Sequence, residues 1–135
     1  MIIQSENSEI LQNDLAYQSF LEENPGRGTL KIRASSASEA MPIKNVTIIV
    51  SKKIGNNTII FYEGQTDNSG MINNIKLPTP KAIQSDEEPP NFTSYQLHAI
   101  YEPDKFDKYY EVSLCCGFSV IQYINITPNV ETEVM

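Results

Sequence analysis

Residues 28–50, GTLKIRASSASEAMPIKNVTIIV, decide the fold of this chain. Every second residue of 29–34 is apolar, and 46–50 repeats this alternation after a polar loop. Successive side chains of a β-strand point to opposite faces, so a period of two predicts a strand with one buried face and one wet face. The stretch therefore predicts two strands of a half-buried sheet.

The same alternation returns further along the chain, between segments that favour reversals. Gly55-Asn56-Asn57 and Thr66-Asp67-Asn68-Ser69-Gly70 are such segments, because Gly and Asn tolerate positive φ and an Asp carboxylate accepts bonds from nearby N–H groups. Further strands are expected at 58–66, 71–77, 95–101, 109–115 and 118–127. Seven short strands at this spacing predict an all-β chain folded as a two-sheet sandwich.

The first part of the chain has a different pattern. Apolar residues in 8–24 recur at a loosely helical period, Ser8 can cap the start, and Pro25-Gly26 ends the run. We expect a short helix whose apolar side rests on the sandwich; the alternative is an arm that becomes ordered only against a partner. The predicted division is an N-terminal helical arm at 1–27 and a β-sandwich domain at 28–135.

Charge excludes several kinds of partner. The formal net charge is −7, and residues 1–24 contain no base but five acids: Glu6, Glu9, Asp14, Glu22 and Glu23. Nucleic acid and acidic membrane surfaces are not expected, because no basic stripe is present to replace the counterions of phosphates. No apolar run approaches the about 20 residues that span a bilayer, and the N-terminus lacks the pattern of a signal peptide. The chain is therefore expected to stay in the cytoplasm as synthesised.

Two polar segments are candidate partner-binding surfaces. Pro78–Asn91 has four prolines and an acidic run, so it is expected to be a surface loop, and Glu102–Tyr110 is charged and aromatic. Exposed aromatic residues often anchor interfaces, although here they could instead close one end of the sandwich. The candidate partner-binding residues are Tyr101, Phe106, Tyr109, Tyr110, Asp86, Glu87 and Glu88.

No residues with recognisable catalytic or metal-binding spacing stand out. Cys115 and Cys116 are adjacent, His98 is the single histidine, and a metal site needs more ligands. We expect His98 to face solvent and the cysteines to be reduced thiols; a vicinal disulfide is the alternative for the pair. No catalytic, metal or cofactor-binding residue is predicted, and the chain is not expected to be an enzyme.

Several segments carry a family resemblance. Residues 28–50, the turn TDNSG (66–70) and YQLHAIY (95–101) resemble the prealbumin-like, carboxypeptidase-regulatory-type domain. NPGRG (24–28), LPTP (77–80) and VSLCCGFSVIQYINITP (112–128) look like small domains of spore-forming clostridial-type bacteria, which often accompany peptidoglycan-binding or cortex-lytic modules. The resemblance implies a seven-stranded prealbumin-like (Ig-like) sandwich without catalysis, associated with spores or the cell envelope.

The function expected from these observations is a non-catalytic interaction or structural module that binds another protein in a cell-envelope or sporulation context. Direct peptidoglycan or carbohydrate binding is one alternative, weakened by the absence of Trp. A pilus- or adhesin-type domain with a covalent Lys31–Asn125 bond is another, although Lys31 alternates outward. Enzymatic relatives of the fold hydrolyse a cyclic urate product with several His and Arg residues and a C-terminal Tyr-Arg-Gly-Ser. This chain has one His and ends in ETEVM, so an enzyme is the least expected class.

Overall fold

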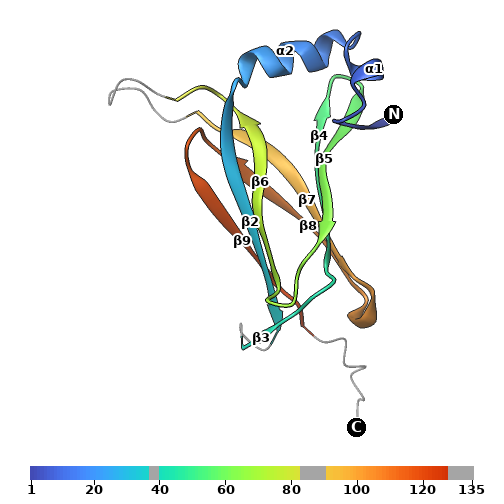
Figure 1. Ribbon diagram of the computed structural model, residues 1–135. Helices are drawn as coiled ribbons and strands as arrows, with labels where there is room; N and C mark the ends of the chain where they lie inside the picture. Colours follow the sequence, from blue (N-terminus) through green and yellow to red (C-terminus); the bar gives the residue numbers. More distant parts are fainter. Residues whose placement is uncertain (37–39, 83–90, 128–135) are drawn as a thin grey trace.

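Two β-sheets pack face to face, and a helical arm lies across one end of them (Figure 1). The computed structural model describes residues 1–36, 40–82 and 91–127. Its elements are β1 (Ile2–Gln4), α1 (Ser8–Leu11), α2 (Leu15–Glu23), β2 (Gly26–Ser36), β3 (Met41–Pro42), β4 (Thr47–Ile54), β5 (Asn57–Gln65), β6 (Met71–Thr79), β7 (Thr93–Tyr101), η1 (Glu102–Asp104), β8 (Phe106–Leu114) and β9 (Ser119–Asn125). The prediction of an all-β two-sheet sandwich with a short N-terminal helix is confirmed.

Strand pairing gives two mixed sheets. The five-stranded sheet has the order β1-β5-β4-β7-β8, with β1 parallel to β5. In the four-stranded sheet, β2 pairs antiparallel with β6 and β3 and parallel with β9. Strands β1 and β3 were not predicted from the sequence, because segments of three and two residues are too short to display a period.

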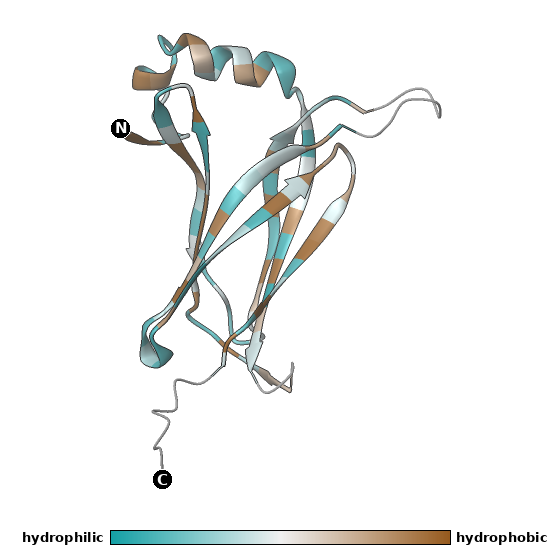
Figure 2. Cartoon of the chain, turned by 180° about the vertical axis from the view of Figure 1, so that it is seen from behind, coloured by the Kyte–Doolittle hydropathy of each residue, from teal (hydrophilic) through white to brown (hydrophobic). Residues whose placement is uncertain are grey.

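The core lies between the sheets and follows the alternation read from the sequence. Leu30, Ile32, Ile48, Val50 and Leu97 are fully buried. Figure 2 shows the same period along the strands as alternating hydrophobic and hydrophilic bands. On β9 the buried residue is Ile124, whereas Ile121 and Tyr123 point away from the core.

The turn at Thr66–Gly70 forms as its residues predict. The Asp67 carboxylate oxygen Oδ1 accepts hydrogen bonds from the backbone N–H groups of Ser69 (2.9 Å) and Met71 (3.0 Å). Gly70 has a φ of 73°, which a residue with a Cβ atom adopts only with strain. This turn fixes the connection between β5 and β6.

The strand expected at 109–115 begins earlier than predicted, at Phe106. Lys105 adopts a left-handed conformation (φ 53°) and its N–H donates to the Glu102 carbonyl (2.9 Å). This reversal pairs Tyr101 directly with Phe106, so residues 106–110 begin β8. The expectation failed because a single left-handed lysine makes a tighter turn than the charged composition suggested.

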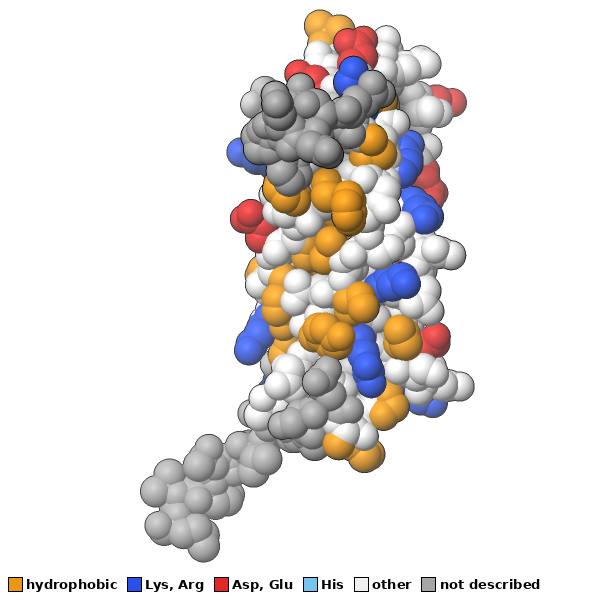
Figure 3. All heavy atoms as spheres, turned by 90° about the vertical axis from the view of Figure 1, so that its left-hand side faces the viewer, with side chains coloured by type: hydrophobic (Ala, Val, Ile, Leu, Met, Phe, Trp, Pro, Cys, Tyr) orange, Lys and Arg blue, Asp and Glu red, His pale blue; other side chains and the backbone are white. Residues whose placement is uncertain are grey.

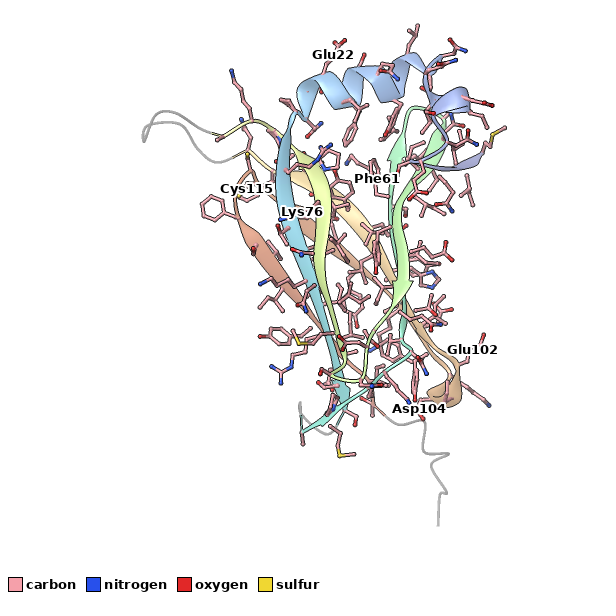
Figure 4. The ribbon with its side chains drawn as sticks, in the orientation of Figure 1. Glu22, Phe61, Lys76, Glu102, Asp104 and Cys115 are labelled. Atoms are coloured by element: carbon pink, nitrogen blue, oxygen red, sulfur yellow. The ribbon has the colours of Figure 1, made fainter. Side chains whose placement is uncertain are left out.

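The arm docks on its own sandwich. Strand β1 joins the five-stranded sheet beside β5, and α2 buries Tyr17 and Phe20. Phe61 lies on β5 beneath α2 (Figure 4), and its ring centroid is 5.8 Å from that of Phe20. Among the described residues, no helix is long and apolar enough to cross a membrane.

Replacing Phe20 with Ala is expected to reduce the free energy of unfolding by about 3 kcal/mol, because the ring is buried against other aromatic rings. Leu15→Ala, on the same helix at 82% exposure, is the matched control and should change stability by less than about 0.5 kcal/mol. Urea unfolding of both variants measures the difference. Equal effects would show that the helix does not contribute to the core.

The N-cap of α2 should make stability depend on pH. Hydrogen bonds from the Tyr17 N–H and then from the Asn57 side chain hold the pKa of Asp14 below its ordinary value. A carboxylate with a lowered folded pKa stabilises the fold above its unfolded pKa, and this contribution is lost as pH falls through the folded value.

Asp14→Ala is therefore expected to lower the thermal unfolding midpoint at neutral pH. The difference from the wild type should shrink as pH falls below the ordinary Asp range. A difference that stays constant in acid would contradict a role for the ionised carboxylate.

Candidate functional site

The five-stranded sheet splits near the arm. β4 pairs with β7 only from Thr47–Ser51 opposite Gln96–Ile100, although β4 continues to Ile54 and β7 starts at Thr93. In Figure 1, β4 and β5 rise toward α1 whereas β7 leans away from them. The end of β4 and the start of β7 therefore border an opening, which we call the Lys52 opening.

Lys52 bridges this opening. Its Nζ donates a hydrogen bond to the Ser94 carbonyl (2.7 Å) and lies 5.8 Å from the centroid of the Tyr95 ring. No carboxylate among the described residues comes within ion-pair distance of this ammonium group. An ammonium group has three N–H donors, so it can accept an anionic neighbour while the bond to Ser94 remains.

An open groove of about 560 Å³ lies on one side of the Lys52 opening. It is lined by Lys52, Lys53, Ser94, Tyr95, Gln96, Tyr109, Tyr110 and Glu111. Burial raises the pKa of Tyr110, so its hydroxyl stays protonated at neutral pH and is available as a donor. The lining of the groove thus combines ammonium, hydroxyl and amide donors with aromatic rings. Glu111 is the one carboxylate in this lining.

A second hollow of about 600 Å³ lies beneath the end of α2 and shares Lys52 and Ser94 with the groove. Asn24 and Thr93 border it and are both buried. The Thr93 hydroxyl donates to the Asn24 side-chain oxygen, and the Asn24 amide donates to the Phe20 carbonyl (2.8 Å). This chain of hydrogen bonds ties the helix end to the start of β7 and holds the opening in shape.

Tyr109 and Tyr110 of β8 both border the groove, although they point to opposite faces of the strand. Tyr109 is exposed, and its ring stacks on His98 with centroids 4.0 Å apart. His98 Nε2 lies 2.6 Å from Asp107 Oδ1. His98 is therefore not simply facing solvent, since its side chain is only 20% exposed between these two residues.

The residues proposed from the sequence as a partner-binding surface do not gather in one place. Tyr109 and Tyr110 border the groove. Phe106 is buried, and Tyr101, opposite it on β7, packs against the core. The acidic run 86–88 lies outside the described residues.

Lys52 was not proposed from the sequence, although a signal existed. It continues the phase of Ile48 and Val50, the buried side of β4, and Ile54 after it is buried as well. A lysine in a buried phase either reaches solvent past its neighbours or occupies a gap in the fold. Tertiary packing decides whether neighbouring strands leave a gap, so the sequence could not specify which of these two positions Lys52 takes.

Cys115 and Cys116 are free and half-buried. Across the ranges 1–36, 40–82 and 91–127, no group of three His, Cys, Asp or Glu side chains is placed to hold a metal ion. Lys31 pairs with Ile121 and Asn125 pairs with Ser35 on the parallel ladder of β2 and β9. This register separates Lys31 from Asn125 along the strands and rules out the covalent bond of the pilus-type alternative.

Similarity to known proteins is found at the level of structure. No family model and no curated protein matches the chain. The solved structure of 5-hydroxyisourate hydrolase from Klebsiella pneumoniae is similar, with a TM-score of 0.47 and 18% identity over 75% of this chain and 90% of that one. The chain itself is a two-sheet β-sandwich with a short helical arm. The likeness is one of fold alone, and the hydrolase activity is that of the neighbour.

This comparison corrects the function expected from the sequence. A non-catalytic interaction or structural module of the cell envelope or of spores was predicted, but the similar solved structure is that of an enzyme. The comparisons give no support for a role in an envelope or in sporulation. The prediction was wrong because it took the function of a scaffold from a resemblance of short motifs, and such scaffolds carry many functions.

Tyr95 is the buried support of the opening. Its hydroxyl donates to the Pro78 carbonyl (2.5 Å), and Phe61 packs edge-on against its ring at 5.3 Å. Tyr95→Phe is expected to lower the free energy of unfolding by about 1 kcal/mol, because the carbonyl loses its partner in a buried place. Tyr109→Phe, whose ring is exposed, is the control and should be nearly neutral. Chemical unfolding measures the free energy of unfolding of the two variants. Equal values would show that the Tyr95 hydroxyl contributes nothing to stability.

Proposed function

We propose that the chain binds a small organic anion, a carboxylate or a phosphate ester, in the Lys52 opening. The observation that carries this proposal is the position of Lys52, a half-buried residue whose ammonium group makes a single described hydrogen bond, to the Ser94 carbonyl. A charged hydrogen bond in a partly buried place is stronger than one on an open surface, because water competes less and the local dielectric is lower.

The surroundings of Lys52 favour a ligand with a flat or apolar body. Lys53 adds a second positive charge at the groove, whereas Tyr109 and Tyr110 offer aromatic surface beside it. Glu111, the carboxylate of the groove, would repel a second acidic group at the far end of the ligand. A ligand with one acidic group and an uncharged or cationic remainder therefore fits better than a polyanion.

The finer part of the family resemblance is also a proposal. Residues 28–50, 66–70 and 95–101 support a relationship with carboxypeptidase-regulatory-type domains. The motifs at 24–28, 77–80 and 112–128 support a relationship with small domains of spore-forming clostridial-type bacteria. A protein partner, a cytoplasmic location and the absence of catalysis stay predictions from the sequence.

Isothermal titration of the full chain against a panel of carboxylates, phosphate esters and zwitterionic amino acids tests the binding proposal. Lys52→Met keeps the apolar stem and removes the charge, so it should weaken binding of an anion from the panel about tenfold to a hundredfold. Lys44→Met, an exposed lysine elsewhere, is the matched control and should bind like the wild type. Absence of saturable binding across the panel, or equal affinity in Lys52→Met, would contradict the proposal.

A further inference from the structure

The charge of the four-stranded sheet is opposite in sign to that of the whole molecule. Strands β2, β3, β6 and β9 contain no acidic residue but four bases: Arg27, Lys31, Arg33 and Lys76. The chain as a whole has a formal net charge of −7. The sheet is therefore a positive surface on a negative protein, and such a surface attracts acidic groups selectively.

Apolar side chains lie between these bases on the outer face of the sheet. The register places Ile121 beside Lys31 and Tyr123 beside Arg33, and Met71 lies on the other side of Arg33. Ile121 is 46% exposed and Tyr123 is 48% exposed. Figure 3 shows hydrophobic side chains gathered along the middle of this face, with Lys and Arg beside them. We call it the basic face.

The arm of the same chain has the complementary character. Residues 1–24 have five acids and no base, and Glu6, Glu9, Glu22 and Glu23 are exposed. Large apolar side chains also point to solvent from this arm: Met1, Ile2, Ile10 and Leu15. An acidic surface with exposed apolar residues is the kind of partner that the basic face can bury with both charge and contact satisfied.

We propose that the basic face of one copy of the chain binds the acidic arm of a second copy. The two surfaces differ, so the contact is heterologous, and repeated contacts produce rings or open chains of copies. A symmetric contact between two basic faces would bring like charges together, which disfavours it. The arm remains docked on its own sandwich through Tyr17 and Phe20, and only its outer acidic side contacts the neighbour.

Sedimentation of the full chain at increasing concentration and at two salt concentrations tests this contact. Self-association should be present at low salt and weaken in high salt, because the screening length falls from about 10 Å at 0.1 M to about 3 Å at 1 M. Reversing Lys31→Glu and Arg33→Glu, or alternatively Glu6→Lys and Glu9→Lys, should weaken association about tenfold or more. A chain with both pairs reversed should associate again.

The arm variant gives the decisive contrast. Glu6→Lys with Glu9→Lys makes the net charge of the chain less negative, so non-specific association between copies would increase. The proposal requires that association decrease. Lys105→Glu with Lys108→Glu changes two exposed bases at the start of β8, away from the basic face, and is the matched control, which should associate like the wild type. Circular dichroism and the thermal midpoint confirm that each variant is folded. If a reversed pair unfolds the chain, Ile121→Ser with Tyr123→Ser replaces it and should also reduce association.

Several results would overturn the proposal. A chain that stays monomeric at low salt and high concentration has no such contact. Association could also persist in the basic-face variant and in the arm variant but be lost when a Pro is placed in β9. That result would indicate pairing between strand edges instead. Failure of the doubly reversed chain to recover association would show that the arm and the basic face are not partners.

Discussion

The structure depends on closing the end of the sandwich where the five-stranded sheet splits. Past Ser51 and before Gln96, β4 and β7 no longer pair, so this part of the core has no continuous sheet to cover it. A row of aromatic rings covers the core beside these unpaired ends of β4 and β7. Phe20 contacts Phe61, which packs edge-on against Tyr95, with centroid distances of 5.8 and 5.3 Å. Aromatic rings suit this position because each buries a large area in a defined geometry.

The same split creates the Lys52 opening. Strands that diverge leave backbone groups without a neighbouring strand, and buried backbone groups need other partners. Lys52 supplies one of them at the Ser94 carbonyl. The Tyr95 hydroxyl reaches the other sheet instead, where it donates to the Pro78 carbonyl of β6. The arm, the opening and the candidate ligand site are thus consequences of one interruption in the ladder.

The basic face follows from a different constraint. The strands of the four-stranded sheet alternate as the sequence indicates, so inner residues such as Leu30 and Ile32 were predictable. Which outer residues become neighbours depends on pairing. The parallel ladder of β2 with β9 sets Ile121 beside Lys31 and Tyr123 beside Arg33, although these residues are far apart in the chain. Charge segregation therefore becomes visible only when the strands are assembled.

The sequence by itself determined most of the strands, the Asp67–Gly70 turn and the presence of a helical arm, because these depend on period, φ preference and local hydrogen bonds. It did not determine the caps of the arm, since Asn7 and Asp14 cap two separate helices where Ser8 was expected to cap one. The strand boundaries at β8 and the short strands β1 and β3 were decided by tertiary structure, since one left-handed residue at Lys105 and pairing with distant strands fix them. The candidate site was decided there as well. A lysine in the buried phase of a strand becomes a site residue only where neighbouring strands diverge, and divergence is a property of packing between segments that local sequence does not contain.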